Sequence, residues 1–127
     1  MSFTQRIIDF FSRKSTASKG GGDKAISKQK AGGKLTARER IEALLDPGSF
    51  HEYDLFVQHK CKDFGMDGKE LAADGVITGT GTISGKPVCI YAQDFTVAGG
   101  SLGNMHARKI TKVMDHAINL GIPIIGI

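Results

Sequence analysis

Apolar and polar positions divide the second half of the chain into strand-like and helix-like segments. Residues 88–92 form an apolar run with the length and bulk of a buried strand, and residues 122–127 form a second one. Between them lie a glycine-rich stretch at 93–103 and apolar side chains at helical spacing over 104–120. A strand, a loop, a helix and a second strand make a βαβ unit, whose right-handed crossover sets the two strands parallel.

The helix at 104–120 is predicted to be amphipathic. Its apolar side is formed by Ala107, Ile110, Val113, Met114, Ala117 and Ile118. Its polar side is formed by Arg108, Lys109, Lys112, Asp115 and Asn119. We therefore expect the first set to face the sheet. Gly121 supplies a C-cap, and Pro123 begins the next strand.

An antiparallel hairpin is predicted before this unit. Residues 76–83 are β-branched and punctuated by glycine, and Ser84-Gly85 separates them from the strand-like run 86–91. Two such runs around a short glycine-containing turn form a hairpin. Gly79, Gly81 and Gly85 resemble a phosphate-binding pattern, but no helix begins after them to supply the N-terminal dipole of such a site. The pattern therefore favours the hairpin.

A further helix is predicted to begin after Thr36. Thr36 and Glu39 have the spacing of a capping box, and Asp46-Pro47-Gly48 ends the helix. Residues 50–57 alternate loosely, which indicates an edge strand or an extended segment. Residues 59–73 are polar and irregular and are typical of a surface loop.

The N-terminal part of the chain has a different character. Residues 3–13 predict a short amphipathic helix that would dock on a larger body, although a basic, serine-rich mitochondrial targeting peptide is the alternative. Residues 15–34 are rich in glycine, serine and lysine. Residues 23–31 have a composition that tolerates one short helix, but the flanking glycines favour a linker. Residues 1–34 are thus predicted to be a basic helix and linker, separate from 35–127.

Charge and composition restrict the classes of function. The 127 residues carry a net charge of +4, and residues 1–40 hold ten Lys or Arg against three acids. A solvated basic segment is the plain interpretation, and an arm that meets phosphates or an acidic partner is the alternative. We expect no nucleic-acid binding, because no such motif is present. No apolar run approaches the ~18–20 residues of a membrane span.

The reactive side chains do not assemble into a recognisable centre. Two cysteines, Cys61 and Cys89, form no disulfide framework and have no C-x-x-C partner, which is consistent with a reducing cytoplasm. The four histidines are scattered, and the two-residue spacing of His59 and Cys61 suits no common metal site, so we predict none. No catalytic triad and no catalytic side chain can be assigned.

The glycine-rich stretch is the strongest candidate for a binding site. Residues 99–103 follow a strand and precede a helix, at the sheet edge where open parallel sheets bind ligands. Gly99, Gly100 and Gly103 could serve only tight turns, with Ser101 capping the helix. They could equally form a wall of backbone N–H groups beside the positive end of the helix. The pattern alone leaves both interpretations open.

Several linked motifs resemble one family. The chain is similar, from about residue 20 to residue 127, to the opening of the carboxyltransferase subunit of biotin-dependent acyl-CoA carboxylases, a family that includes propionyl-CoA carboxylase β chains, large transcarboxylase subunits and acyl-CoA decarboxylase α subunits. The motifs are Gly33 to Ile41, Leu44 to Phe50, Asp63-Phe64-Gly65-Met66-Asp67, Ala73-Asp74-Gly75-Val76, Gln93-Asp94-Phe95-Thr96-Val97 and Gly99-Gly100-Ser101-Leu102-Gly103.

The resemblance implies the N-terminal part of an α/β crotonase-like (ClpP/crotonase) domain. It also implies a coenzyme A thioester such as propionyl-CoA as substrate and biotin, as carboxybiotin on a partner, as carboxyl carrier. The partners implied are a biotin carboxylase or biotin carboxyl carrier subunit and further copies in a homo-oligomer. From the cysteines we expect the cytoplasm, with the mitochondrial matrix as the alternative. In such enzymes the acyl α-carbon loses a proton and the enolate attacks the carboxyl group, while backbone N–H groups stabilise the developing charge.

The resemblance covers only part of the site. The family's Asp-Ser-Gly-Gly-Ala-Arg segment, which supplies an enolate-holding N–H, would follow residue 127, so we expect this piece to be inactive by itself. The substrate wall carried over consists of Phe95, Gly99, Gly100, Ser101, Leu102 and Gly103. Lys34, Arg38 and Arg40 are candidate contacts for coenzyme A phosphates, with solvated surface charge as the alternative. A biotin-dependent decarboxylase α subunit and a non-catalytic binding or assembly module remain the alternative functions.

Overall fold

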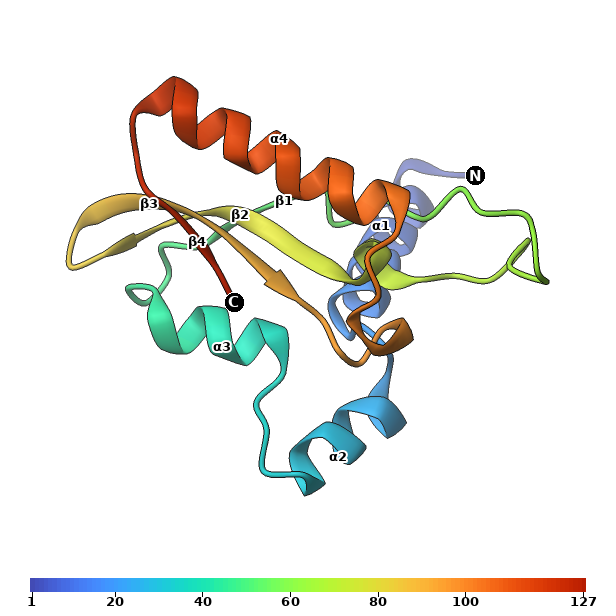
Figure 1. Cartoon of the computed structure of the whole chain (residues 1–127). Helices are drawn as coiled ribbons and strands as arrows, with labels where there is room; N and C mark the ends of the chain where they lie inside the picture. Colours follow the sequence, from blue (N-terminus) through green and yellow to red (C-terminus); the bar gives the residue numbers. More distant parts are fainter.

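A four-stranded sheet lies between two helices in the computed structural model, which describes all 127 residues (Figure 1). The strands lie in the order β1-β2-β3-β4. Helix α4 covers one face and the shorter helix α3 covers the other (Figure 1). The elements are α1 (Phe3–Ser18), α2 (Asp23–Ala31), α3 (Ala37–Leu44), β1 (His51–Tyr53), β2 (Val76–Ile83), β3 (Lys86–Gln93), α4 (Asn104–Leu120) and β4 (Ile124–Gly126).

The predicted hairpin is formed by β2 and β3. The two strands pair antiparallel from Val76 opposite Gln93 to Ile83 opposite Lys86, around the Ser84-Gly85 turn. The glycines of β2 allow close packing and do not form a phosphate loop. A Cβ on Gly79 would overlap the backbone carbonyl of His51 in β1, and one on Gly81 would press into the Leu45 side chain. These contacts confirm the structural interpretation of the glycines in this strand.

The predicted βαβ unit is also present. Strand β4 pairs parallel to β3, with Cys89 opposite Ile124, and α4 crosses between them. The helix has the predicted bounds, and Gly121 takes the left-handed conformation that ends it. Gln93 donates its backbone N–H to Ile127 O at 3.0 Å, so the pairing reaches the point where β3 passes into the glycine-rich stretch.

Successive side chains of β3 point to opposite faces of the sheet, so they contact α3 and α4 in turn. Val88, Ile90 and Ala92 pack with α3 on one face, while Cys89 packs with Val113 and Ala117 of α4 on the other. Each fully buried side chain of this size contributes about 1.5–3 kcal/mol to folding. The orientation of both helices is therefore fixed by one strand.

The capping box of α3 is confirmed. Thr36 Oγ1 accepts the backbone N–H of Glu39 at 3.2 Å, and Glu39 Oε2 accepts the backbone N–H of Thr36 at 2.9 Å. Lys30 of α2 adds an ion pair to Glu39 at 2.6 Å. The side-chain hydrogen bond from Lys30 is the largest cause of the lowered pKa of Glu39. The start of α3 is thus tied to α2.

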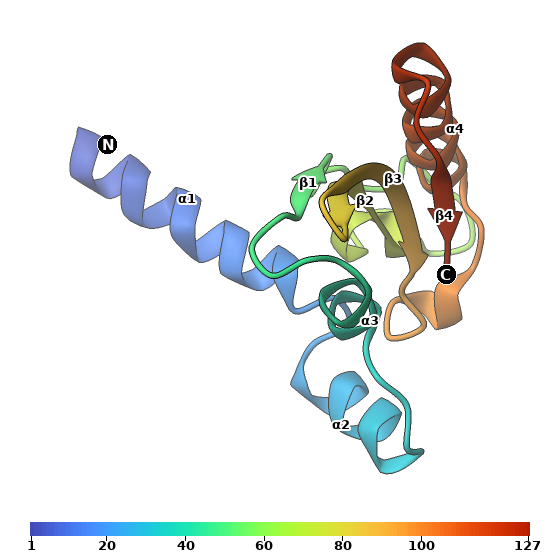
Figure 2. The same ribbon diagram turned by 90° about the vertical axis from the view of Figure 1, so that its left-hand side faces the viewer.

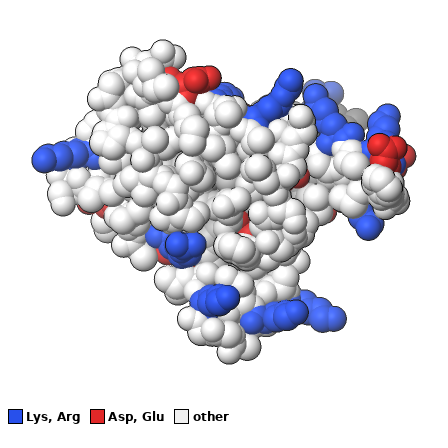
Figure 3. All heavy atoms as spheres, viewed as in Figure 1, with Lys and Arg blue, Asp and Glu red and all other residues white.

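The N-terminal segment is more ordered than the sequence predicts. Helix α1 continues to Ser18, beyond the predicted end at residue 13, and residues 23–31 form α2 where the flanking glycines favoured a linker. The glycines lie at the ends of the helix: Gly22 is its N-cap and Gly32 its C-cap. Figure 2 shows α1 projecting away from the sheet, while α2 lies beneath α3. On the face shown in Figure 3, lysine side chains protrude over α2.

Candidate functional site

The glycine-rich stretch lies at the carboxyl end of β3, as predicted. It contains one turn of 3₁₀ helix, Ala98–Gly100, in which Gly99 and Gly100 have φ values of +66° and +73°. L-residues rarely adopt this conformation, so the bend favours glycine at both positions. Helix α4 begins directly afterwards with Gly103 as its N-cap. The bend therefore brings the positive end of a helix to one edge of the sheet, while the N–H groups of Gly100 and Ser101 donate to Val97 O and Ala98 O within the turn.

A pocket of about 530 Å³ lies against this stretch. This volume is within the ~300–1,000 Å³ range of ligand pockets. Its other wall is the loop between β1 and β2. The lining residues are His59, Lys60, Cys61, Met66 and Leu71 from that loop, Asp74 and Gly75 before β2, and Val97, Ala98, Ser101, Leu102, Gly103 and Asn104 from the glycine-rich side.

Half of the predicted substrate wall lines this pocket. Ser101, Leu102 and Gly103 do so, whereas Phe95, Gly99 and Gly100 lie outside the lining. Phe95 is 58% exposed, and its ring packs over Gly100, where an added Cβ would lie 3.3 Å from Phe95 Cδ1. Ser101 does not cap α4, because its hydroxyl donates to Ala98 O at 2.6 Å.

The side chain that caps α4 is Asp74, from a different part of the chain. Asp74 Oδ2 accepts the backbone N–H of His106 in the first turn of α4 at 2.9 Å. Both Ala73 and Asp74 have positive φ, +50° and +46°, and Gly75 follows at +72°. Because residues 73–75 and the start of α4 are bonded together, the floor of the pocket and the glycine-rich wall form one unit. Asp74 belongs to one of the sequence motifs, but no residue near it in the sequence indicates this role.

His106 is buried beside Asp74. Its ring Nδ1 lies 2.9 Å from the Asp74 carbonyl oxygen and its Nε2 lies 3.3 Å from the Gln93 side-chain nitrogen. Desolvation lowers the pKa of His106 below its usual value, which outweighs the opposing effect of Asp74. The neutral ring with its proton on Nδ1 satisfies both contacts, since the carbonyl oxygen accepts and the amide nitrogen donates.

Lys109 corrects the predicted helix faces. It was expected on the polar side of α4, yet it is 3% exposed, whereas Ile118 of the predicted apolar side is 76% exposed. Lys109 Nζ donates to Ala73 O at 2.8 Å and to Val76 O. Strand β1 pairs only with residues 78–80 of β2, so its end leaves the Val76 carbonyl without a strand partner. The lysine replaces that partner, and its burial lowers its pKa to about 8.

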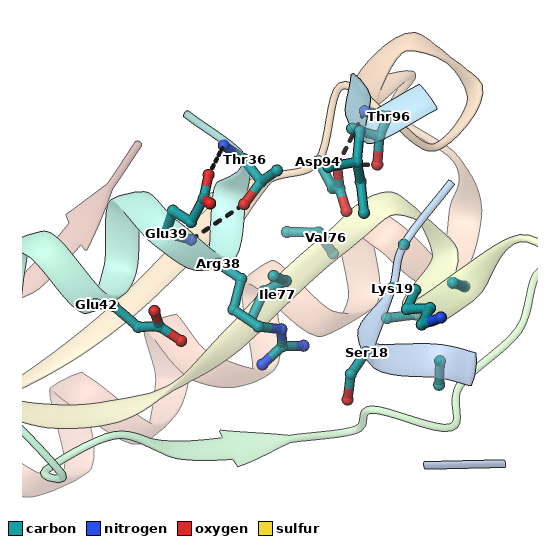
Figure 4. Close-up of a pocket in the computed structure, with 15 residues that line it drawn as sticks. Ser18, Lys19, Thr36, Arg38, Glu39, Glu42, Val76, Ile77, Asp94 and Thr96 are labelled. Atoms are coloured by element: carbon teal, nitrogen blue, oxygen red, sulfur yellow. Dashed lines mark hydrogen bonds between the residues drawn. The ribbon is translucent and has the colours of Figure 1, made fainter. Parts of the chain in front are cut away.

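The three predicted phosphate contacts lie outside the pocket lining. Arg38 donates two hydrogen bonds to Glu52, at 2.8 and 3.1 Å. Figure 4 shows Arg38 extending from α3 toward the end of α1, in a separate cavity of about 120 Å³. Lys34 is exposed and Arg40 is half-buried. A phosphate role for these residues stays a prediction. Lys60, which sequence analysis did not single out, is a cation that lines the pocket.

Comparison with known proteins identifies the family. Residues 28–127 match the model of the carboxyl transferase domain. The chain belongs to the carboxyl transferase domain family. It is 56% identical over 115 residues to the propionyl-CoA carboxylase beta chain of Cereibacter sphaeroides, covering 91% of this chain and 22% of that protein. It is 50% identical over 123 residues to the methylmalonyl-CoA decarboxylase subunit alpha of Propionigenium modestum, covering 97% and 24%.

The fold agrees with a solved carboxyl transferase structure. The transcarboxylase 12S structure with methylmalonyl-coenzyme A and methylmalonic acid bound matches 99% of this chain with a TM-score of 0.96 and 41% identity. The match covers 25% of that protein. This chain therefore spans about a quarter or less of the length of these relatives. No helix of this chain is both long and apolar enough to cross a membrane.

Proposed function

We propose that this chain forms the acyl-CoA side of a carboxyltransferase active site, in the N-terminal part of a crotonase-like domain. The observation that carries the proposal is the pocket of about 530 Å³ between residues 59–71 and the glycine-rich stretch, at the carboxyl end of β3. Its lining combines apolar side chains with the N-terminal end of α4 and Lys60. A thioester with a flexible pantetheine arm and an anionic end suits this combination.

The proposed reaction moves a carboxyl group between carboxybiotin and the α-carbon of a short acyl-CoA. The α-carbon loses a proton, and the resulting enolate forms a carbon–carbon bond to the carboxyl carbon. The carbon–nitrogen bond of carboxybiotin breaks, and that nitrogen takes up a proton. No titratable side chain of the glycine-rich wall is placed as a base. Residues 101–103, which line the pocket, would bind and orient the thioester beside the positive end of α4.

Binding tests the substrate wall directly. Calorimetric titration of the 127-residue chain with propionyl-CoA should give saturable, salt-sensitive binding, because part of the attraction comes from charge. Free coenzyme A should compete. Absence of binding to either compound would contradict the proposal. Binding to an acidic protein or nucleic acid in its place would favour a non-catalytic module.

A chimaera tests the reaction. The chain would replace the corresponding quarter of the transcarboxylase 12S subunit, which it matches at a TM-score of 0.96. We expect the chimaera to transfer the carboxyl group of methylmalonyl-CoA to biotin. A chimaera that assembles normally but transfers nothing would contradict the assignment. Because this chain spans about a fifth of the length of its relatives, we expect no transfer by the chain alone.

A decarboxylase α subunit is the second candidate. The methylmalonyl-CoA decarboxylase subunit alpha of Propionigenium modestum is 50% identical over 97% of this chain, which is close to the carboxylase value. Both candidates use the same acyl-CoA wall. Two chimaeras distinguish the two functions, one built on a propionyl-CoA carboxylase beta chain and one on a methylmalonyl-CoA decarboxylase subunit alpha. Each is expressed in a strain that lacks the enzyme on which it is built. The strain that recovers shows which reaction the residues support.

A further inference from the structure

The turn between α1 and α2 contacts the bend at which β3 leaves the sheet. Gly21 donates its backbone N–H to Thr96 Oγ1 at 3.0 Å, across 75 positions of sequence. The Thr96 hydroxyl in turn donates to Asp94 Oδ1 at 2.6 Å, and the Thr96 backbone N–H donates to the same oxygen at 2.9 Å. Asp94 is 8% exposed. One chain of hydrogen bonds thus runs from the N-terminal segment to residues 94–96.

The two segments approach too closely for a side chain at Gly20 or Gly21. A Cβ on Gly21 would overlap the backbone carbonyl of Thr96, and a Cβ on Gly20 would overlap Asp94 Oδ2. The Gly21 φ does not lie in the left-handed region, so glycine is required at this position by contact and not by backbone conformation. In the sequence Gly20 and Gly21 suggest a flexible linker, but in the structure they allow the turn between α1 and α2 to pack against residues 94–96.

The contacted bend leads directly into the candidate binding wall. Phe95 lies between the two residues of the bend, and its ring packs over Gly100. Asp94 also donates its backbone N–H to Gly75 O at 2.8 Å, next to the floor of the pocket. Figure 4 shows Asp94 and Thr96 on one side of the small cavity and Lys19 across from them. A shift of the bend would move Phe95 and change the path of residues 97–103.

We propose that residues 19–22 act as a clamp that positions the glycine-rich wall for acyl-CoA. The clamp lies outside residues 28–127, which match the carboxyl transferase domain. It touches no substrate and works through the Gly21–Thr96 hydrogen bond, so Gly20, Gly21 and Thr96 are positioning residues. The role in binding rests on the proposed function. The restraint that the clamp places on residues 94–96 does not rest on the proposed function, and it can be measured without any ligand.

The first test compares two glycine substitutions. Gly21→Ala places a methyl group against the Thr96 carbonyl, whereas Gly32→Ala, in the same N-terminal segment, meets only ordinary contacts from 3.4 Å. Hydrogen exchange of the amides of residues 95–103 should become at least about tenfold faster in Gly21→Ala and stay unchanged in Gly32→Ala. Equal exchange in both variants would overturn the clamp.

The second test concerns the hydroxyl. Thr96→Val keeps the shape of the side chain and removes the donor and acceptor, while Thr96→Ser keeps the hydroxyl. Thr96→Val loses both hydrogen bonds of the hydroxyl, to Gly21 and to Asp94. We expect propionyl-CoA binding to weaken at least roughly fivefold, the equivalent of one net hydrogen bond, and Thr96→Ser should recover most of it. The double variant Gly21→Ala/Thr96→Val should bind no more weakly than Gly21→Ala alone. Additive losses, or no recovery by serine, would overturn the clamp.

The two proposals fail in different ways. If the unmodified chain binds no propionyl-CoA, the proposed function and the role of the clamp in binding both fail, and exchange alone then shows whether the turn restrains the bend. If the unmodified chain binds propionyl-CoA and Gly21→Ala binds it equally well, the clamp fails and the proposed function stands. Thermal unfolding of each variant, measured alongside, separates loss of the fold from loss of positioning.

Discussion

The carboxylate of Asp74 accepts the backbone N–H of His106 at 2.9 Å, and the Asp74 carbonyl oxygen lies 2.9 Å from Nδ1 of the same histidine. Asp74 thus contacts both the main chain and the side chain of His106, which lies 32 positions away in the sequence. This pair joins the left-handed segment at 73–75 to the first turn of α4. It is the reason that the floor and one wall of the pocket keep a fixed relationship.

Asp74→Ala should destabilise the chain by about 1–3 kcal/mol, because it leaves the buried His106 N–H without an acceptor. Asp74→Asn should cost much less, since its amide oxygen can accept the same bond and asparagine tolerates positive φ. Urea unfolding followed by circular dichroism measures both. Equal losses for the two variants would show that the negative charge, and not the hydrogen bond, is what α4 requires.

The buried Lys109 predicts an unusual pH dependence. Its pKa is about 8 in the folded chain because of burial, against roughly 10.4 when unfolded. Between these values the unfolded chain binds a proton that the folded chain does not, so stability rises with pH over this window. At 1.36 kcal/mol per pKa unit the gain is about 3 kcal/mol.

Lys109→Met should remove this gain from the pH profile of unfolding between pH 8 and 10. The control is Lys112→Met, in which an exposed ammonium that pairs with Asp54 is lost. Both variants retain Cys89, whose pKa is raised by burial and which lowers stability over the same alkaline range. The difference between the two profiles therefore isolates Lys109. Identical slopes would contradict its assignment as a buried, partly deprotonated lysine.

Two glycines of β2 should respond differently to alanine. A Cβ on Gly79 overlaps the backbone carbonyl of His51, which cannot move without displacing β1, whereas one on Gly81 meets the end of the Leu45 side chain. We expect Gly79→Ala to cost about 1–3 kcal/mol or more, and Gly81→Ala less, because a side chain can rotate away. Thermal unfolding gives the ranking, and a reversed order would refute it.

The Phe95–Gly100 contact gives a matched pair within the glycine-rich wall. Gly99 and Gly100 both have positive φ, so alanine strains the backbone at either position. Only at Gly100 would the methyl group also press on the Phe95 ring. Gly100→Ala should therefore weaken propionyl-CoA binding about tenfold more than Gly99→Ala, a difference of about 1.4 kcal/mol. Similar affinities for the two variants would remove Phe95 from the binding wall.

The position of Lys60 predicts which cation meets the phosphates. Lys60→Gln should weaken binding of propionyl-CoA but not of propionyl-pantetheine, which lacks the nucleotide.

Arg38→Gln should lower stability by about 1–3 kcal/mol with little effect on affinity, because the guanidinium is bonded to the half-buried Glu52. Lys34→Gln and Arg40→Gln, measured by the same calorimetry, decide whether the contacts expected from the sequence also exist. An unchanged affinity in Lys60→Gln would contradict the proposed orientation of coenzyme A.

Local patterns predicted those parts of the fold whose cause is local. The capping box at Thr36 and Glu39, the Ser84-Gly85 turn and the bounds of α4 all follow from residues a few positions apart. The position of the glycine-rich stretch at the sheet edge was also predictable, because β3 and α4 fix its two ends.

The residues that were missed depend on contacts across long separations. A helical wheel assigns Lys109 to solvent, since nothing local shows that β1 ends too early to pair with Val76. His106 and Asp74 become a pair only when α4 is placed over β2. Gly20 and Gly21 suggest flexibility until Thr96 lies against them. In each case tertiary packing decides the environment, and propensity does not.

The Gly21–Thr96 bond also has a kinetic consequence. It closes a separation of 75 residues, while the Asp74–His106 contact closes one of 32. Chain closure costs more entropy as the separation grows, so we expect these contacts to form after local ones during folding. The hairpin and α4 can assemble early, from neighbours in sequence. We therefore expect the glycine-rich stretch to acquire its final shape late, once the turn at residues 20–22 packs against the completed sheet.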